Sequence, residues 1–149
     1  MQSHGPFMEG KMIIPVLSVA DVDASVNFYT EKLGFTREFA FPGPDGKNTF
    51  ASVKLGEAHV MVGTDSDLKS VGKGVEFMIY IPENADIDDY YAQTQARGVE
   101  IAKELKTAYW GDRVFTVNDP DGYVISLTKT VQNVPMEEIE AVISGAAAR

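Results

Sequence analysis

A tight turn at residues 119–122, Asp-Pro-Asp-Gly, restricts the fold of this chain more than any other local feature. Pro120 sets φ close to the value that the second turn position requires, Asp121 can hydrogen-bond its own backbone, and Gly122 accepts a positive φ. Residues 123–127 then read Tyr-Val-Ile-Ser-Leu, a run rich in strand-forming side chains. The segment therefore predicts a hairpin, and the remaining pattern must decide which β-rich fold contains it.

The first half of the chain predicts one strand, one helix and three further strands. Residues 11–19 are apolar and β-rich, and Pro15 suits a position where the ladder needs no N–H. Asp23 can cap the helix that follows, and Gly34 ends it. Its apolar side is spaced for a helix and consists of Val22, Val26, Tyr29 and Leu33. Turn residues at 42–46 and Gly56 then separate expected strands at residues 35–41, 48–55 and 58–62.

The second half repeats this order. A strand at residues 75–81 and a helix at 86–97 precede three strands at 99–105, 113–117 and 123–129. Gly34 and Gly98 lie 64 positions apart, and Gly56 and Gly122 lie 66 apart. The chain therefore looks like an internal duplication of a βαβββ module, which is an α+β fold.

The expected domain organisation follows from this repeat. Residues 11–66 and 73–131 are expected to form the two modules of one domain, and residues 1–10 a flexible tail that contains His4. Residues 132–149 hold a last helix and a tail, with Pro135 at the first helical position and Gly145 after the end. The apolar stripe of that helix could pack on its own domain or on a partner subunit, and it consists of Met136, Ile139, Val142 and Ile143.

Composition limits the classes of function. A chain of 149 residues with 44% hydrophobic residues is expected to form one globular domain, and it has no cysteine for disulfides, thiolate metal sites or nucleophiles. The absence of a long apolar run or of a signal-peptide core predicts a cytoplasmic protein without a membrane partner. The net charge of −9 disfavours nucleic acid and anionic membranes and favours cationic ligands.

Three segments together resemble the vicinal-oxygen-chelate superfamily, namely residues 18–29, residues 110–115 and the hairpin segment 117–127. That superfamily includes glyoxalase I, fosfomycin-resistance enzymes, extradiol dioxygenases and bleomycin-resistance proteins. The resemblance covers about residues 11–129, and it implies two βαβββ modules whose strands curl around a cavity with the helices outside. It also implies a symmetric homodimer.

The metal-ligand positions that this resemblance implies are mostly occupied by side chains that bind no hard metal. Aligned with metal-dependent members, they fall on Ile14, Met61, Glu76 and Ser126, of which only Glu76 is a credible ligand. A shift of two residues would bring His59 to the position on the fourth strand, and two ligands would still be too few. We therefore expect no catalytic metal and no other cofactor.

An organic ligand is the expected occupant of such a cavity. Met78 and Tyr80 share strand parity with Glu76, and His59 shares it with Met61, so all five are expected to face inward with Ser126 and Ile14. Trp110, the single tryptophan, resembles the ring-stacking wall of bleomycin-resistance-like members. Ordinary structural roles stay open for three of these residues: core packing for Trp110, a surface carboxylate for Glu76 and a hydrogen-bonded strand residue for His59.

Two classes of function are compatible with these residues. The first is a metal-free binding protein that sequesters or senses a small aromatic molecule, neutral or cationic. The second is an enzyme of the lyase, isomerase or dioxygenase type, in which Glu76 and His59 are the acid–base candidates. No Gly-x-Ser-x-Gly surrounds Ser18, Ser52 or Ser126, and no phosphate-binding loop or dinucleotide fingerprint occurs. The missing metal ligands favour the binding protein.

Overall fold

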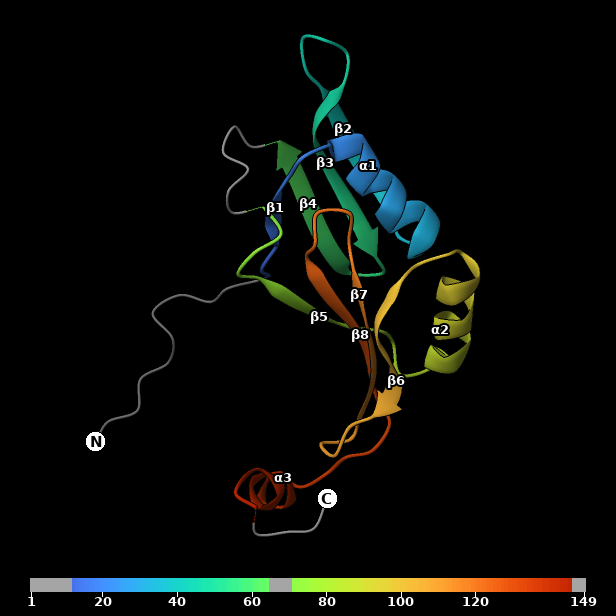
Figure 1. Cartoon of the computed structure of the whole chain (residues 1–149), viewed down its shortest axis with the longest axis vertical. Helices are drawn as coiled ribbons and strands as arrows, with labels where there is room; N and C mark the ends of the chain where they lie inside the picture. Colours follow the sequence, from blue (N-terminus) through green and yellow to red (C-terminus); the bar gives the residue numbers. More distant parts are fainter. Residues whose placement is uncertain (1–11, 65–70, 146–149) are drawn as a thin grey trace, which may run out of the picture.

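The computed structural model describes residues 12–64 and 71–145 and contains the expected βαβββ order twice (Figure 1). The first unit consists of β1 Val16–Val19, α1 Val22–Asn27, the π-helical turn η1 Phe28–Lys32, β2 Thr36–Pro42, β3 Asn48–Leu55 and β4 Ala58–Thr64. The second unit consists of β5 Glu76–Tyr80, α2 Ile87–Ala96, β6 Ile101–Thr107, β7 Asp112–Asn118 and β8 Val124–Thr130. Helix α3 Met136–Ile143 follows. The α+β class predicted from the sequence is confirmed.

Each unit folds its strands into a four-stranded sheet of the same topology. The strand orders are β1-β4-β3-β2 and β5-β8-β7-β6, in which only the first pair of each sheet is parallel. Helices α1 and α2 lie on the same side of the two sheets, which do not close on each other (Figure 1). No described helix covers the other side of the two sheets, which we call the open side (Figure 1).

The core lies between the sheets and the helices. The four apolar side chains predicted for the first helix are all buried, and they pack with Val53 and Val62 of the sheet. The predicted cap Asp23 is wrong. Asp21 has extended backbone angles directly before Val22 and accepts the N–H of Ala24, whereas Asp23 already lies in the first turn.

Strand β1 is shorter than the predicted residues 11–19, because it begins at Val16. Pro15 precedes it, and the carbonyl oxygen of Pro15 accepts the N–H of Met61 at 2.9 Å while its own nitrogen has no hydrogen to donate. Ile14 consequently lies before the strand and not within it.

The turn at residues 119–122 joins the two modules. Its Asp121 carboxylate accepts the backbone N–H of Ala20 at 2.9 Å and the hydroxyl of Ser25 at 3.2 Å. Tyr123, just after the turn, donates its hydroxyl to the carbonyl oxygen of Ser18 at 2.9 Å. The hairpin of the second module thus holds the start of α1 in the first.

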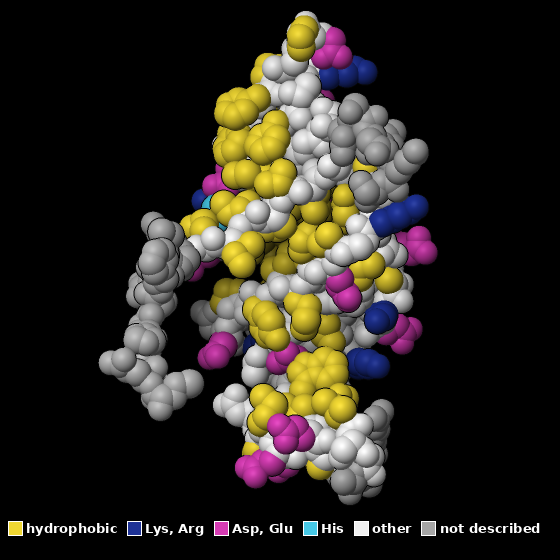
Figure 2. Space-filling model, turned by 90° about the vertical axis from the view of Figure 1, so that its left-hand side faces the viewer, with side chains coloured by type: hydrophobic (Ala, Val, Ile, Leu, Met, Phe, Trp, Pro, Cys, Tyr) yellow, Lys and Arg dark blue, Asp and Glu magenta, His cyan; other side chains and the backbone are white. Residues whose placement is uncertain are grey.

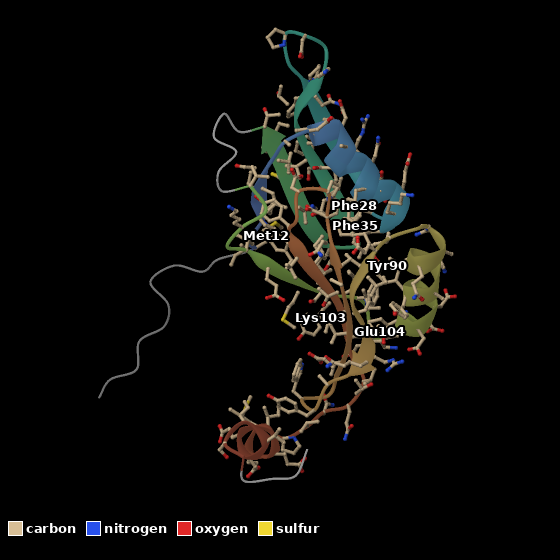
Figure 3. All side chains as sticks on the ribbon, viewed as in Figure 1. Met12, Phe28, Phe35, Tyr90, Lys103 and Glu104 are labelled. Carbon is tan, nitrogen blue, oxygen red and sulfur yellow. The ribbon has the colours of Figure 1, made fainter. Side chains whose placement is uncertain are left out.

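A second link lies in the helix layer. Tyr90 of α2 donates its hydroxyl to the carbonyl oxygen of Leu33 at 2.7 Å, and Lys32 donates to the carbonyl oxygen of Arg97 at 2.8 Å. Phe28 and Tyr90, both labelled in Figure 3, pack against the buried core that includes Phe35. Gly34 and Gly98 end the two corresponding helices, both with φ of 80°, so the repeated glycines serve the same purpose in each module.

Helix α3 extends away from both sheets at one end of the molecule (Figure 1). None of its residues is buried, and Met136 and Ile143 are 68% and 64% exposed. Pro135 is its N-cap and not its first helical residue. Of the four residues in its apolar stripe, Met136 and Ile143 are exposed, whereas Ile139 and Val142 are partly buried. No described helix is long and apolar enough to cross a membrane. The predicted tail at residues 1–10 lies outside the described residues.

Candidate functional site

The open faces of the two sheets carry five of the predicted ligand-binding side chains, two on β4 and three on β5. On β4, Val60 and Val62 are buried toward α1, so His59 and Met61 project to the open side. The same alternation on β5 buries Ile79 and leaves Glu76, Met78 and Tyr80 exposed on the opposite face, the three residues that strand parity grouped together. Figure 2 looks onto this side of the molecule and shows hydrophobic side chains along most of its length.

A buried carboxylate organises the aromatic side chains of the second module. Asp112 Oδ2 accepts the hydroxyl of Tyr80 at 2.7 Å and the indole N–H of Trp110 at 3.1 Å, and its Oδ1 accepts the hydroxyl of Thr130 at 2.9 Å. The hydrogen bond to Asp112 raises the pKa of Tyr80. Tyr80 and Trp110 nevertheless remain 54% and 38% exposed. The two predicted aromatic contacts therefore meet at one anchor that the sequence analysis missed, although Asp112 stands only two positions after Trp110.

A second polar cluster lies on the open face of the first module. Glu38 Oε1 lies 2.6 Å from Nδ1 of His59 and accepts the hydroxyl of Ser52 at 2.8 Å. Hydrogen bonds from His59 and then from Ser52 lower the pKa of Glu38. Glu38 was missed because a bulge interrupts β2 between Arg37 and Phe39, which changes the strand parity there.

Three phenylalanines form an aromatic surface farther along the same open face. The ring centroids of Phe39 and Phe41 lie 5.0 Å apart, and those of Phe39 and Phe50 lie 6.3 Å apart, both pairs stacked. Gly63 on the neighbouring strand makes room for them, since a Cβ there would lie 3.2 Å from Cδ2 of Phe50. We call Phe39, Phe41 and Phe50 the phenylalanine cluster.

Two hollows lie where the modules meet. The one on the open side, which we call the seam groove, measures about 270 Å³ and is lined by Ile13, Pro15, Glu57, Ala58, His59, Val60, Phe77, Met78, Ile79 and Tyr80. The adjoining one measures about 560 Å³, reaches toward α2 and is lined by Leu55, Gly56, Glu57, Ala58, Tyr80, Ile81, Pro82, Ala85 and Tyr90. The seam groove brings together His59, Met78 and Tyr80, three of the predicted contacts.

Known proteins share this architecture. The family model described as Glyoxalase/Bleomycin resistance protein/Dioxygenase superfamily matches residues 12–127. The chain belongs to this superfamily. The match spans both βαβββ modules and ends before α3.

Relatives in the superfamily include proteins of quite different description. An uncharacterized protein of Mycobacterium bovis is 30% identical over 138 residues, which cover 87% of this chain and 90% of that protein. A bleomycin resistance protein of Geobacillus stearothermophilus is also 30% identical, over 134 residues that cover 80% of this chain and 97% of that protein. The solved structure of TioX from Micromonospora sp. ML1 has a TM-score of 0.67 at 22% identity, covers 82% of this chain and 100% of its own, and shows the shared fold.

The metal positions of the superfamily do not match the donors of this chain. Ser126 is buried and shares a 2.9 Å hydrogen bond with Thr116, Met61 pairs with Val16 and Ser52 in the sheet, and Ile14 precedes β1. Glu76 is exposed at the start of β5. Among the described residues, no three His, Cys, Asp or Glu side chains are grouped closely enough to hold an ion. The donor set of the described residues does not fit a catalytic metal.

Proposed function

We propose that this chain is a bleomycin-resistance-like binding protein that holds a small aromatic molecule, neutral or cationic, without a metal. The observation that carries the proposal is the hydrogen-bonded set of Asp112, Tyr80 and Trp110. Hydrogen bonds hold both rings, while Tyr80 and Trp110 remain 54% and 38% exposed. Such a molecule is expected to be sequestered or sensed, because binding alone suffices for either role.

The fixed rings favour binding for a simple reason. Side chains that are already ordered lose little conformational entropy when a ligand arrives. Stacking on an aromatic face adds about 0.5 to 1.5 kcal/mol beyond the burial of area, and a cation over the ring adds about 0.5 to 2 kcal/mol. The net charge of −9 raises the local concentration of cations around the protein. A cationic aromatic ligand uses all three contributions.

We further propose that a second copy of the chain completes the site in a homodimer. The stripe of α3 and the phenylalanine cluster of β2 and β3 are both apolar and solvent-accessible, and they lie at opposite ends of the molecule (Figure 1). A two-fold axis through the open side would place α3 of each copy on the phenylalanine cluster of the other. An eight-residue helix is marginal in water by itself, so α3 needs such a surface.

Fluorescence of Trp110, the only tryptophan, tests the binding proposal directly. A screen of cationic aromatic drugs that includes bleomycin should find at least one that quenches this fluorescence saturably. Asp112→Leu, which removes the anchor of both rings, should weaken that binding, whereas Gln95→Leu on the helix side should not. Failure of every compound to quench Trp110 would remove the basis of the proposal.

An acid–base enzyme is the second candidate, and the contact between Glu38 and His59 is the observation that favours it. A carboxylate that holds one imidazole nitrogen leaves the other able to accept or deliver a proton. Glu76, the other predicted acid–base residue, does not line the seam groove. Product analysis after incubation with a ligand found in the screen decides between the candidates, because conversion that His59→Phe abolishes would establish catalysis.

A further inference from the structure

We propose that the seam groove selects molecules that carry an N–H donor, amines above all. His59 accepts the hydrogen bond from that donor, and Glu38 is the positioning residue that keeps His59 in the accepting form. This inference deepens the proposed function and rests on it. Its basis is the geometry around His59 and the chemistry of the side chains that line the groove.

The contact between Glu38 and His59 determines where the imidazole carries its proton. An ionised carboxylate can only accept hydrogen bonds, so a neutral His59 must carry its hydrogen on Nδ1, 2.6 Å from Glu38 Oε1. Nε2 then has the free lone pair. The hydroxyl of Ser52 donates to the same oxygen of Glu38 and fixes the carboxylate in place. Glu38 thus sets the tautomer of a side chain that lines the groove.

The other polar side chains of the seam groove are also acceptors. Among the described residues that line it, three have polar or charged side chains, namely Glu57, His59 and Tyr80. Glu57 is a carboxylate, and Tyr80 donates its hydroxyl hydrogen to Asp112. None of these described lining residues is a lysine or an arginine. Among these side chains an anion finds no donor, whereas an ammonium group finds acceptors.

The apolar lining accommodates the remainder of an aromatic amine. The Tyr80 ring and the Met78 thioether are both well exposed on the open side, and both interact favourably with aromatic rings. An ammonium group near His59 and Glu57 would leave an attached ring beside these two side chains. The groove therefore fits a primary or secondary aryl-alkyl amine better than a carboxylate or a quaternary ammonium ion, which has charge but no N–H.

Nuclear magnetic resonance can read the tautomer without any ligand. The chain has two histidines, so His4→Gln leaves the ring of His59 as the only imidazole signal. Long-range ¹H–¹⁵N spectra of the neutral imidazole, recorded at about pH 8, should place the hydrogen on Nδ1. Glu38→Gln should retain this tautomer because its side-chain carbonyl still accepts, and Glu38→Leu should lose it. A hydrogen on Nε2 in the parent protein, or no change in Glu38→Leu, would overturn the role of Glu38.

Calorimetry with three matched probes tests the selectivity. The probes are 1-naphthylmethylamine, its N,N,N-trimethyl derivative and 1-naphthylacetate. The amine should bind about tenfold tighter than the trimethyl derivative, the ratio that one hydrogen bond to a charged group supplies, and the acetate should bind weakest. His59→Phe, which keeps a ring but no acceptor, should abolish the preference for the amine, and Glu38→Leu should reduce it.

A charge-matched control separates this hydrogen bond from the overall field of the protein. Glu104→Leu removes one negative charge from β6, outside the groove, and should leave the preference unchanged (Figure 3). Equal affinities for the amine and its trimethyl derivative would overturn the inference about selectivity. The proposed function would still stand in that case if other compounds quenched the fluorescence of Trp110. If nothing quenched Trp110 and no probe bound, both would fail.

Discussion

Tyr29 donates its hydroxyl to Asp119 Oδ2 at 2.8 Å, and this buried bond joins the first helix to the turn of the second module. Asp119 also accepts the backbone N–H groups of Asp121 and Tyr123, so its carboxylate holds the shape of the turn as well. Burial raises the pKa of Asp119, and these three hydrogen bonds oppose that rise. The turn at residues 119–122 is therefore both a hairpin and the junction of the two modules.

Tyr29→Phe is expected to destabilise the fold by about 1 to 3 kcal/mol, because it leaves a buried carboxylate without one of its partners. Urea denaturation followed by circular dichroism measures the change. Tyr91→Phe is the matched control, since its ring packs on Phe115 within the second module and away from this junction. Equal stability of Tyr29→Phe and the parent protein would show that the bond contributes nothing.

Stability should decrease as the pH rises above about 10. Burial raises the pKa of Tyr29 and of Tyr90 above their ordinary value of 10.0, and the charge of Asp119 adds to the effect at Tyr29. Because the folded pKa exceeds the unfolded one, the contribution of each tyrosine is fully present below pH 10 and is lost above it, where only the unfolded chain ionises. Urea midpoints measured from pH 8 to 12 test this. Tyr29→Phe should flatten the decrease, and a constant midpoint would contradict the expectation.

Trp110→Ala should weaken the binding of an aromatic ligand about two- to twelvefold, the ratio that corresponds to one stacking contact. Titration calorimetry is the appropriate measurement, since the substitution removes the fluorophore. Glu76→Gln should weaken binding mainly for cationic ligands, through the field of the protein. Unchanged affinity in Trp110→Ala would exclude this ring from the site.

Protein purified without chelator should contain no stoichiometric zinc, nickel, manganese or iron. The reason is that Ile14, Met61 and Ser126 provide no strong ligand at the positions that the superfamily uses, so Glu76 would stand alone. Elemental analysis measures the content. One equivalent of any of these metals would favour the enzyme over the binding protein.

Light scattering should give twice the chain mass of 16.3 kDa at micromolar concentration. Met136→Glu and Phe41→Glu should each shift the protein toward the monomer, because each places a charge in the proposed contact between α3 and the phenylalanine cluster. Gln95→Glu adds the same charge on α2 and should leave the dimer intact. If neither Met136→Glu nor Phe41→Glu changes the dimer, the homodimer stands and this contact is excluded. A monomeric parent protein would exclude both the homodimer and the contact.

The local pattern of the sequence was sufficient for most of the fold. Apolar spacing identified the buried side of α1, and the glycines at 34 and 98 marked the ends of corresponding helices, because these features depend on backbone angles and periodicity within a few residues. The turn at residues 119–122 was recognisable for the same reason. Strand parity also grouped Met78 and Tyr80 on one face of β5.

Only the tertiary structure decided how the candidate site is assembled. Tyr80 and Trp110 meet at Asp112 because β5 and β7 lie on either side of β8, and no local pattern reports that proximity. Glu38 reaches His59 because a bulge changes the parity of β2, which alternation along a regular strand cannot anticipate. Helix α3 has a readable apolar stripe, but its position away from both sheets depends on which surfaces the rest of the chain has already covered. Pairings within one segment are encoded locally, whereas pairings across the fold depend on the packing of the whole chain.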